Sequence, residues 1–405
     1  MSALSRKTLL LTVLGLGALC WAALPGDHAS VPEVAAAPAS GYRVSGPFTH
    51  DNLTVFLLHG PDTLPPRPIL TLDEALAKGL FVVHETGTVN TLAVENRSDT
   101  DDVLIQPGDI VKGGKQDRLI ASAMLVPAKS GRVAVPSFCV EAGRWTQRGG
   151  EAAVHFAENR AVISGKDLKN AALVNGQQAQ VWENVQKLQQ KLSTNVGKPV
   201  ANPQSPSSLQ LTLEDAAIAD KLKSYEKELG SILRGCRGAV GVVIAVNGKV
   251  TGAEVFGSSA VLAKAWPKAL RSAAVEALAD RTEKPFEPCK SEAVLAFLAD
   301  AEKGQSERLV AADPQSPHDW NRVALFTDGA NTAPAQNLQV QSIENLGVIV
   351  NRADPVQNPA GLSELSRVQQ APVQINRMQG RQAVLVECRD RANPGMLIHR
   401  SYIAK

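Results

Sequence analysis

The chain has 405 residues, of which 44% are hydrophobic and 20% are charged, so it carries enough apolar material for two sizeable cores. Its 42 basic and 40 acidic residues leave a formal net charge of +2. This balance provides no broad field that would steer the chain to nucleic acid or to an anionic membrane surface, so we expect no nucleic-acid partner.

The first 24 residues have the pattern of a secretory signal peptide. Arg6 and Lys7 make the start basic, residues 8–24 are uncharged and rich in Leu, Val, Ala and Gly, and Pro-Gly-Asp follows. We expect export to the periplasm or secretion, with an N-terminal membrane anchor as the alternative and no membrane span after signal removal. Residues 25–44 are rich in Pro and Ala and are expected to form a disordered lead-in.

Residues 45–160 are predicted to be rich in β-strands. A strand at 53–59 precedes a short helix at 71–79, where Thr71 and Glu74 form a capping-box pattern and a glycine ends the helix. Further short apolar runs, separated by turn residues, lie at 81–84, 89–95, 103–106, 118–126 and 132–140. Regularly spaced short strands of this kind are typical of an antiparallel sandwich or barrel.

Residues 161–301 mix helical and strand patterns. Apolar residues recur at helical spacing in 181–192, 213–233 and 258–280, and a proline-containing polar linker covers 193–208. Asn247-Gly248 joins apolar runs at 239–246 and 249–256, which is the clearest hairpin signal in the chain.

The last hundred residues divide into two parts. Residues 302–380 are rich in Gln, Asn and Pro and are predicted to be an insertion of low order, whereas 383–388 and 396–403 have strand patterns. The fold class is therefore predicted to be α+β, with a β-sandwich-like N-terminal layer followed by helices and a β-hairpin.

Four cysteines follow the predicted signal peptide. Cys139, Cys236, Cys289 and Cys388 allow three pairings, and their spacings do not match a zinc site, so no metal or cofactor is expected. If a disulfide forms, Cys236–Cys289 is the favoured pair because the two residues flank the hairpin and the helix after it. Four buried thiols are the alternative.

Common catalytic signatures are missing from the sequence, which has no Gly-x-Ser-x-Gly elbow, His-Glu-x-x-His helix or calcium loop. Two polar motifs stand out instead, GGKQDR at 113–118 and CVEAGRW at 139–145. Charged side chains beside glycines in a strand-rich region indicate a backbone that something approaches closely.

These motifs, with LTLDEALAKGL at 70–80 upstream, resemble the ARG and Rhodanese-Phosphatase-superfamily-associated protein domain family. The resemblance continues through 180–185, the hairpin at 238–258 and the closing residues 399–402. It implies a family domain at 45–301 plus 381–405, interrupted by the insertion at 302–380. The family has no established reaction, and its name implies an accessory role.

The two motifs supply the candidate site. If 118–126 and 132–140 form an antiparallel pair, the charged ends of both strands meet at one edge of the sheet. We then expect six side chains to lie close together: Lys115, Gln116, Arg118, Glu141, Arg144 and Trp145.

Three functions fit this cluster. The leading hypothesis is an exported, non-catalytic module that binds a partner or a small polar ligand, because guanidinium groups bind carboxylate or phosphate in a fork. The second is an enzyme, such as a hydrolase, in which Glu141 acts with Lys115, Arg118 or Arg144. In the third, the charges form internal salt bridges and both motifs are structural.

Two further residues have a structural alternative to a catalytic role. Cys139 could be a nucleophile if a cation lowered its pKa, but it lies in an apolar strand and a buried thiol is favoured. His84 stands beside Glu85, yet adjacent strand residues point to opposite faces, so a structural role is favoured.

Overall fold

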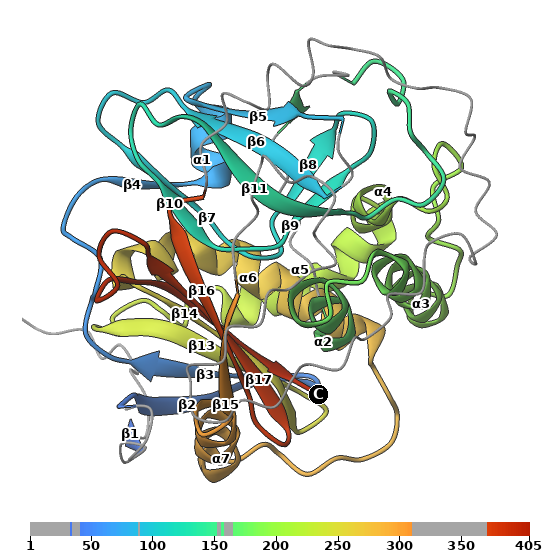
Figure 1. Ribbon diagram of the computed structural model, residues 1–405. Coiled ribbons are helices and arrows are strands. Elements are labelled where there is room, and N and C mark those ends of the chain that lie inside the picture. Colours follow the sequence, from blue (N-terminus) through green and yellow to red (C-terminus); the bar gives the residue numbers. More distant parts are fainter. Residues whose placement is uncertain (1–32, 35–40, 88–89, 152–154, 158–164, 310–370) are drawn as a thin grey trace, which may run out of the picture. The chain divides into compact units, whose positions relative to one another are not determined.

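The computed structural model describes residues 33–34, 41–87, 90–151, 155–157, 165–309 and 371–405 (Figure 1). The predicted signal peptide, most of the predicted lead-in and residues 310–370 of the predicted insertion lie outside the described residues. Among the helices that are described, none combines the length and the apolar composition that crossing a membrane requires.

The largest sheet in the described part of the chain joins strands from both ends of the sequence. At its centre is the predicted hairpin, β13 (Ala239–Val246) and β14 (Lys249–Phe256), whose turn residues Asn247 and Gly248 have φ angles of 50° and 75°. Every neighbouring pair in this sheet is antiparallel. The strand order is β1 (Glu33–Val34), β2 (Arg43–His50), β3 (Leu53–His59), β13, β14, β18 (Leu397–Ala404), β17 (Ala383–Asp390), β16 (Val373–Gln379) and β15 (Gln305–Leu309).

Two smaller sheets contain the other described strands. The first has the order β12 (Phe156–Ala157), β8 (Ile110–Gly113), β9 (Arg118–Ile120), β11 (Gly131–Cys139), β6 (Thr91–Asn96) and β5 (Phe81–Glu85). The second has the order β10 (Met124–Val126), β7 (Asp102–Ile105) and β4 (Ile69–Thr71), and its β4–β7 pair is parallel.

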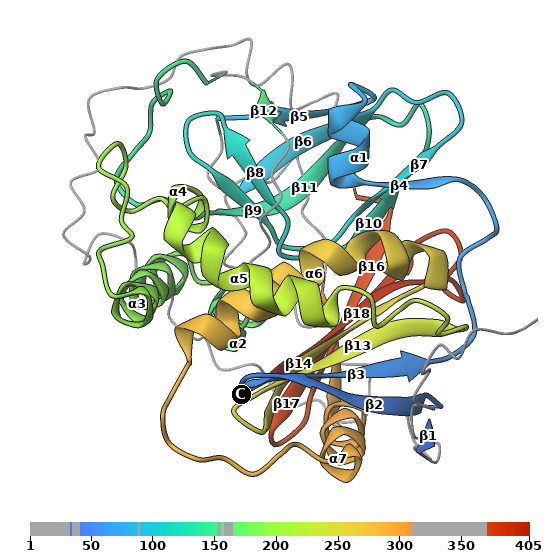
Figure 2. The same ribbon diagram turned by 180° about the vertical axis from the view of Figure 1, so that it is seen from behind.

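Helices cover both faces of the large sheet. Helix α6 (Ser259–Ala279) lies between this sheet and the smaller sheets, and α7 (Ser291–Glu302) lies on the opposite face (Figures 1 and 2). Successive strand side chains point to opposite faces, so Val242 joins the core that contains α6 and Val243 joins the core that contains α7. The other helical segments are α1 (Leu72–Ala77), α2 (Lys166–Lys169), the π-helical η1 (Asn170–Val174), α3 (Gln178–Val196), α4 (Leu209–Leu213) and α5 (Ala216–Leu229).

The predicted α+β class is confirmed, and the hairpin and the strand at 53–59 have the predicted bounds. The capping box at the start of α1 is also present, because the Thr71 hydroxyl accepts from the Glu74 N–H and the Glu74 carboxylate accepts from the Thr71 N–H. The predicted insertion contributes β15 and β16 at its two ends, and these strands pair with each other.

One predicted strand is wrong. Residues 118–126 form two strands, β9 and β10, that belong to different sheets. The chain bends at 121–123, so β9 pairs with β11 while β10 pairs with β7. An uninterrupted apolar pattern predicts burial along 118–126, but it does not reveal that the chain changes its partner strand within the run.

The favoured Cys236–Cys289 pair is not a disulfide, and none of the four cysteines in the described part of the chain takes part in one. Cys236 packs against the core that contains α6, whereas Cys289 is part of the core that contains α7. The flanking positions in the sequence therefore do not bring the two sulfur atoms together.

Candidate functional site

The two polar motifs meet where β9 pairs with the end of β11. The antiparallel register places Arg118 opposite Cys139, so the residues before β9 and after β11 leave the sheet at the same edge. The six residues predicted from the sequence lie in one cluster there. Gln116 belongs to it because its backbone carbonyl oxygen accepts from Arg118 Nη1 at 3.3 Å, and the contacts of the other five are described below. The chain reaches this edge by a longer route than predicted, through β10 in another sheet.

The inner part of the cluster is a network of buried ions. Asp117 and Glu141 are both fully buried. Arg148 donates from Nη1 to Oδ2 of Asp117 at 2.9 Å and from Nη2 to Oδ1 at 3.1 Å. Arg144 Nη2 donates to Glu141 Oε2 at 2.5 Å, and Ser205 donates its hydroxyl to Glu141 Oε1. Each buried carboxylate is thus matched by a guanidinium group, which buried charges require.

The two acids respond differently to this environment. Burial raises the pKa of Asp117, and the hydrogen bonds and charge of Arg148 only partly offset it. Burial would also raise the pKa of Glu141, but hydrogen bonds from Arg144 and Ser205 outweigh it and lower the pKa. Glu141 is therefore the more firmly ionised of the two.

The middle part of the cluster centres on Arg118, which is fully buried. Its Nη2 contacts Glu85 Oε2 at 3.3 Å, and its Nη1 donates to the Cys139 sulfur at 3.1 Å. Burial raises the pKa of Cys139 to about 11, even though Arg118 acts to lower it. Cys139 is therefore protonated at neutral pH and unsuited to act as a nucleophile, consistent with the structural alternative.

His84 and Glu85 do not form an acid–base pair. Glu85 points to Arg118, whereas His84 Nε2 lies 3.0 Å from Glu95 Oε2 on the neighbouring strand. Alternation along β5 separates the two side chains, as the sequence predicts.

The outer part of the cluster is Trp145, whose exposed fraction is 39%. Lys115 Nζ lies 5.3 Å and Arg118 Cζ 5.1 Å from the centre of a Trp145 ring, both within cation–π range. Among the described residues, Lys115 forms no ion pair, and the buried Nε of Arg118 has no hydrogen-bond partner. An aromatic surface with two cations beneath it thus faces solvent above the buried ions.

Sequence reasoning missed several members of the cluster. Arg148 stands three residues after the second motif. A basic residue this close to CVEAGRW was the one sequence feature that could have pointed to its membership of the cluster. Ser205 and Ser208 lie in the segment predicted to be a linker, and Ser208 donates to Asp117 Oδ2 at 3.1 Å. Nothing local in the sequence connects Ser205 to Glu141, 64 residues away, or Ser208 to Asp117, 91 residues away.

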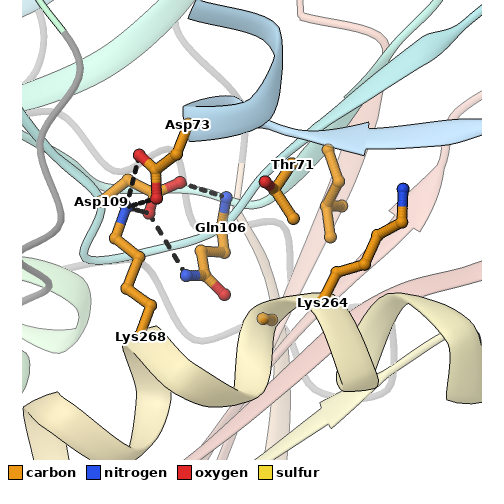
Figure 3. A pocket seen from close by; sticks show the side chains of 8 residues that line it. Thr71, Asp73, Gln106, Asp109, Lys264 and Lys268 are labelled. Carbon is orange, nitrogen blue, oxygen red and sulfur yellow. Dashed lines mark hydrogen bonds and ion pairs between the residues drawn. The ribbon is translucent and has the colours of Figure 1, made fainter. Parts of the chain in front are cut away.

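A separate small hollow lies between α1, α6 and the turn before β8 (Figure 3). Lys268 Nζ projects from α6 and contacts Asp109 Oδ1 at 2.8 Å and Asp73 at 3.0 Å. Burial would lower the pKa of Lys268, but these two carboxylates raise it. The hollow has room for about one water, with about 20 Å³ of accessible space. Its central lysine is paired with two carboxylates, so this ion cluster links α6 to the smaller sheets and leaves no unpaired charge at its centre for a ligand.

Fold and site together define a class of protein, an α+β domain with a matched buried ion network beneath an exposed tryptophan. The chain belongs to the ARG and Rhodanese-Phosphatase-superfamily-associated Protein domain family, whose model matches residues 41–333. No curated protein and no solved structure matches the chain.

Proposed function

We propose that this protein is an exported, non-catalytic module that binds a polar ligand or partner through Trp145 and Lys115, with the buried Arg118 packed against the Trp145 ring. The observation that carries the proposal is the exposure of Trp145 directly above two cations. Trp and Arg are the residue types most enriched at binding hot spots, because they combine apolar area with directional polar groups. The buried ion network holds this surface in place.

The charge of the surface indicates a negatively charged ligand group. Arg118 shares its charge with Glu85, whereas Lys115 has no carboxylate partner among the described residues. A carboxylate or phosphate could accept from Lys115 Nζ while its carbon skeleton packs on the Trp145 ring. The same chemistry accommodates a small anion or an acidic side chain of a partner.

Binding explains the cluster better than the hydrolase alternative. An acid or base in catalysis must reach a substrate, but Glu141 is fully buried and already accepts from Arg144 and Ser205. The purely structural alternative accounts for Asp117, Glu141 and Arg148 and for the packing of Trp145 on Arg118, but it gives no role to the exposed part of the Trp145 ring or to Lys115, which forms no ion pair among the described residues.

A thermal-shift screen of small carboxylates and phosphates on the secreted protein tests the proposal. A ligand present at 100 times its Kd should stabilise the wild type by about 2.7 kcal/mol. Trp145→Ala and Lys115→Ala should lose this shift. Phe286→Ala is the matched control, because Phe286 has the same 39% exposure outside the cluster, and it should retain the shift. A shift that survives in Trp145→Ala, or no shift with any anion, would contradict the proposal.

A further inference from the structure

A second polar cavity lies between the large sheet and α6. Strands β13, β14 and β18 contribute one side, α6 the other, and α2 and the residues at 106–107 also line it. It encloses about 630 Å³ when space open to solvent is counted, and about 40 Å³ of it is accessible to the centres of water molecules. That is room for about three waters, or for a ligand of a few heavy atoms.

The sheet register places an acid and a histidine side by side in this cavity. Glu254 on β14 pairs with Ser401 on β18, and His399 stands two residues before Ser401 on the same face. His399 Nε2 lies 3.2 Å from Glu254 Oε2, while Lys169 Nζ donates to Glu254 Oε1 at 2.8 Å. Burial would raise the pKa of Glu254, but Lys169 and His399 outweigh it and hold the pKa at about 2.

His399 is left with one buried nitrogen that has no partner. When the ring carries one proton, on Nε2 facing Glu254, Nδ1 is an acceptor. His399 is 1% exposed, and Nδ1 has no hydrogen-bond partner among the described residues. Nδ1 therefore offers an acceptor to a hydrogen-bond donor that enters the cavity.

Glu276 on α6 is the second buried group in this cavity whose charge is only partly compensated by the described residues. Its carboxylate accepts from the Lys166 backbone N–H and the Thr251 hydroxyl, both at 3.3 Å, and forms no ion pair within the described part of the chain. Burial raises its pKa, because the distant charge of Lys169 does not fully offset it. Lys169 is already bound by Glu254, so a cation from outside the protein would complete the charge balance.

We propose that this cavity binds a short amino alcohol, whose ammonium group pairs with Glu276 and whose hydroxyl donates to Nδ1 of His399. Two carboxylates, Glu254 and Glu276, and two lysines, Lys166 and Lys169, line the cavity. Lys166 Nζ donates to the Lys405 carbonyl oxygen at 2.9 Å and Lys169 Nζ donates to Glu254, so neither lysine pairs with Glu276, which favours a positively charged ligand beside it. The volume accessible to water limits the ligand to a few heavy atoms. The site shares no residue with the Trp145 surface.

Calorimetric titration of the whole secreted protein with ethanolamine tests this inference. Ethylene glycol, which has the same size without charge, and glycolate, which is negative, serve as comparison probes. Ethanolamine should bind saturably, and ethylene glycol should bind about tenfold more weakly or worse, because it lacks the charge-assisted hydrogen bond to Glu276. No saturable ethanolamine binding, or equal binding of either comparison probe, would overturn the proposal.

Matched variants assign the binding to the cavity. Glu276→Gln and His399→Gln keep the shape, and the glutamine at 399 can still donate to Glu254, so each should weaken ethanolamine binding about tenfold. Glu183→Gln removes an exposed acid that pairs with Lys187 on α3 and should change nothing. Wild-type affinity in both cavity variants would refute the assignment.

Ala269→Leu fills the cavity without removing a polar group and should abolish binding even if the polar variants fold poorly. Binding retained in Ala269→Leu would again refute the assignment. Trp145→Ala should bind ethanolamine like the wild type, so failure of the Trp145 proposal is distinguishable from failure of this one.

Discussion

Arg144 and Arg148 both contact Glu141, but their removal leaves different charges unmatched. Arg148→Ala removes two hydrogen bonds from the fully buried Asp117 and leaves it only one ion pair, the longer one with Arg144 at 3.8 Å, so we expect a loss of about 3–5 kcal/mol. Arg144→Ala leaves Glu141 with Arg148 and Ser205, so we expect only about 1–2 kcal/mol. Urea unfolding of the two variants measures the difference in the free energy of unfolding.

Equal losses in the two variants would show that the network shares its charge evenly and that Asp117 has no special dependence on Arg148. The sequence indicated a salt bridge between Arg144 and Glu141 as one alternative, and the structure contains that contact. The position of Arg148 beside CVEAGRW did not reveal its partner, because the pairing with Asp117 joins residues 31 positions apart.

At the scale of elements, the Asn247-Gly248 turn sets the register of the central hairpin. A Cβ on Gly248 would lie 1.9 Å from the Glu287 carbonyl oxygen, and its φ of 75° disfavours other residues. Gly248→Ala should therefore lower the free energy of unfolding by about 2 kcal/mol or more, measured by chemical denaturation.

Gly235→Ala is the control for this prediction. Gly235 has a similar φ of 80°, but no atom lies within 4 Å of the position that a Cβ would take there, so this change introduces backbone strain alone. Its cost should be about 1 kcal/mol. Equal costs at both positions would mean that the close approach to Glu287 relaxes freely.

At the scale of the whole molecule, the N-terminal pattern predicts export. The basic start and the apolar run at 8–24 predict that the secreted protein begins between about residues 21 and 40, which N-terminal sequencing would detect. Leu14→Asp interrupts the apolar run and should retain the chain in the cytoplasm with Met1 intact. Wild-type protein that keeps Met1 in the cytoplasm would contradict the prediction.

The sequence by itself determined the local elements of this protein. The hairpin at 239–256, the capping box at Thr71 and the amphipathic helix α3 follow from interactions between residues a few positions apart. Such interactions favour the same local conformation before the chain is folded, which is why a pattern of residue types predicts them.

Only the tertiary structure decided which elements pair and which charges are buried together. β3 pairs with β13 about 190 residues later, and β18 pairs with β14, although no local sequence pattern predicts either pairing. Likewise Ser208 reaches Asp117 and His399 reaches Glu254 because distant segments pack on one core. These contacts form only when burial of apolar surface repays the entropy of closing long loops, and that balance is a property of the whole fold.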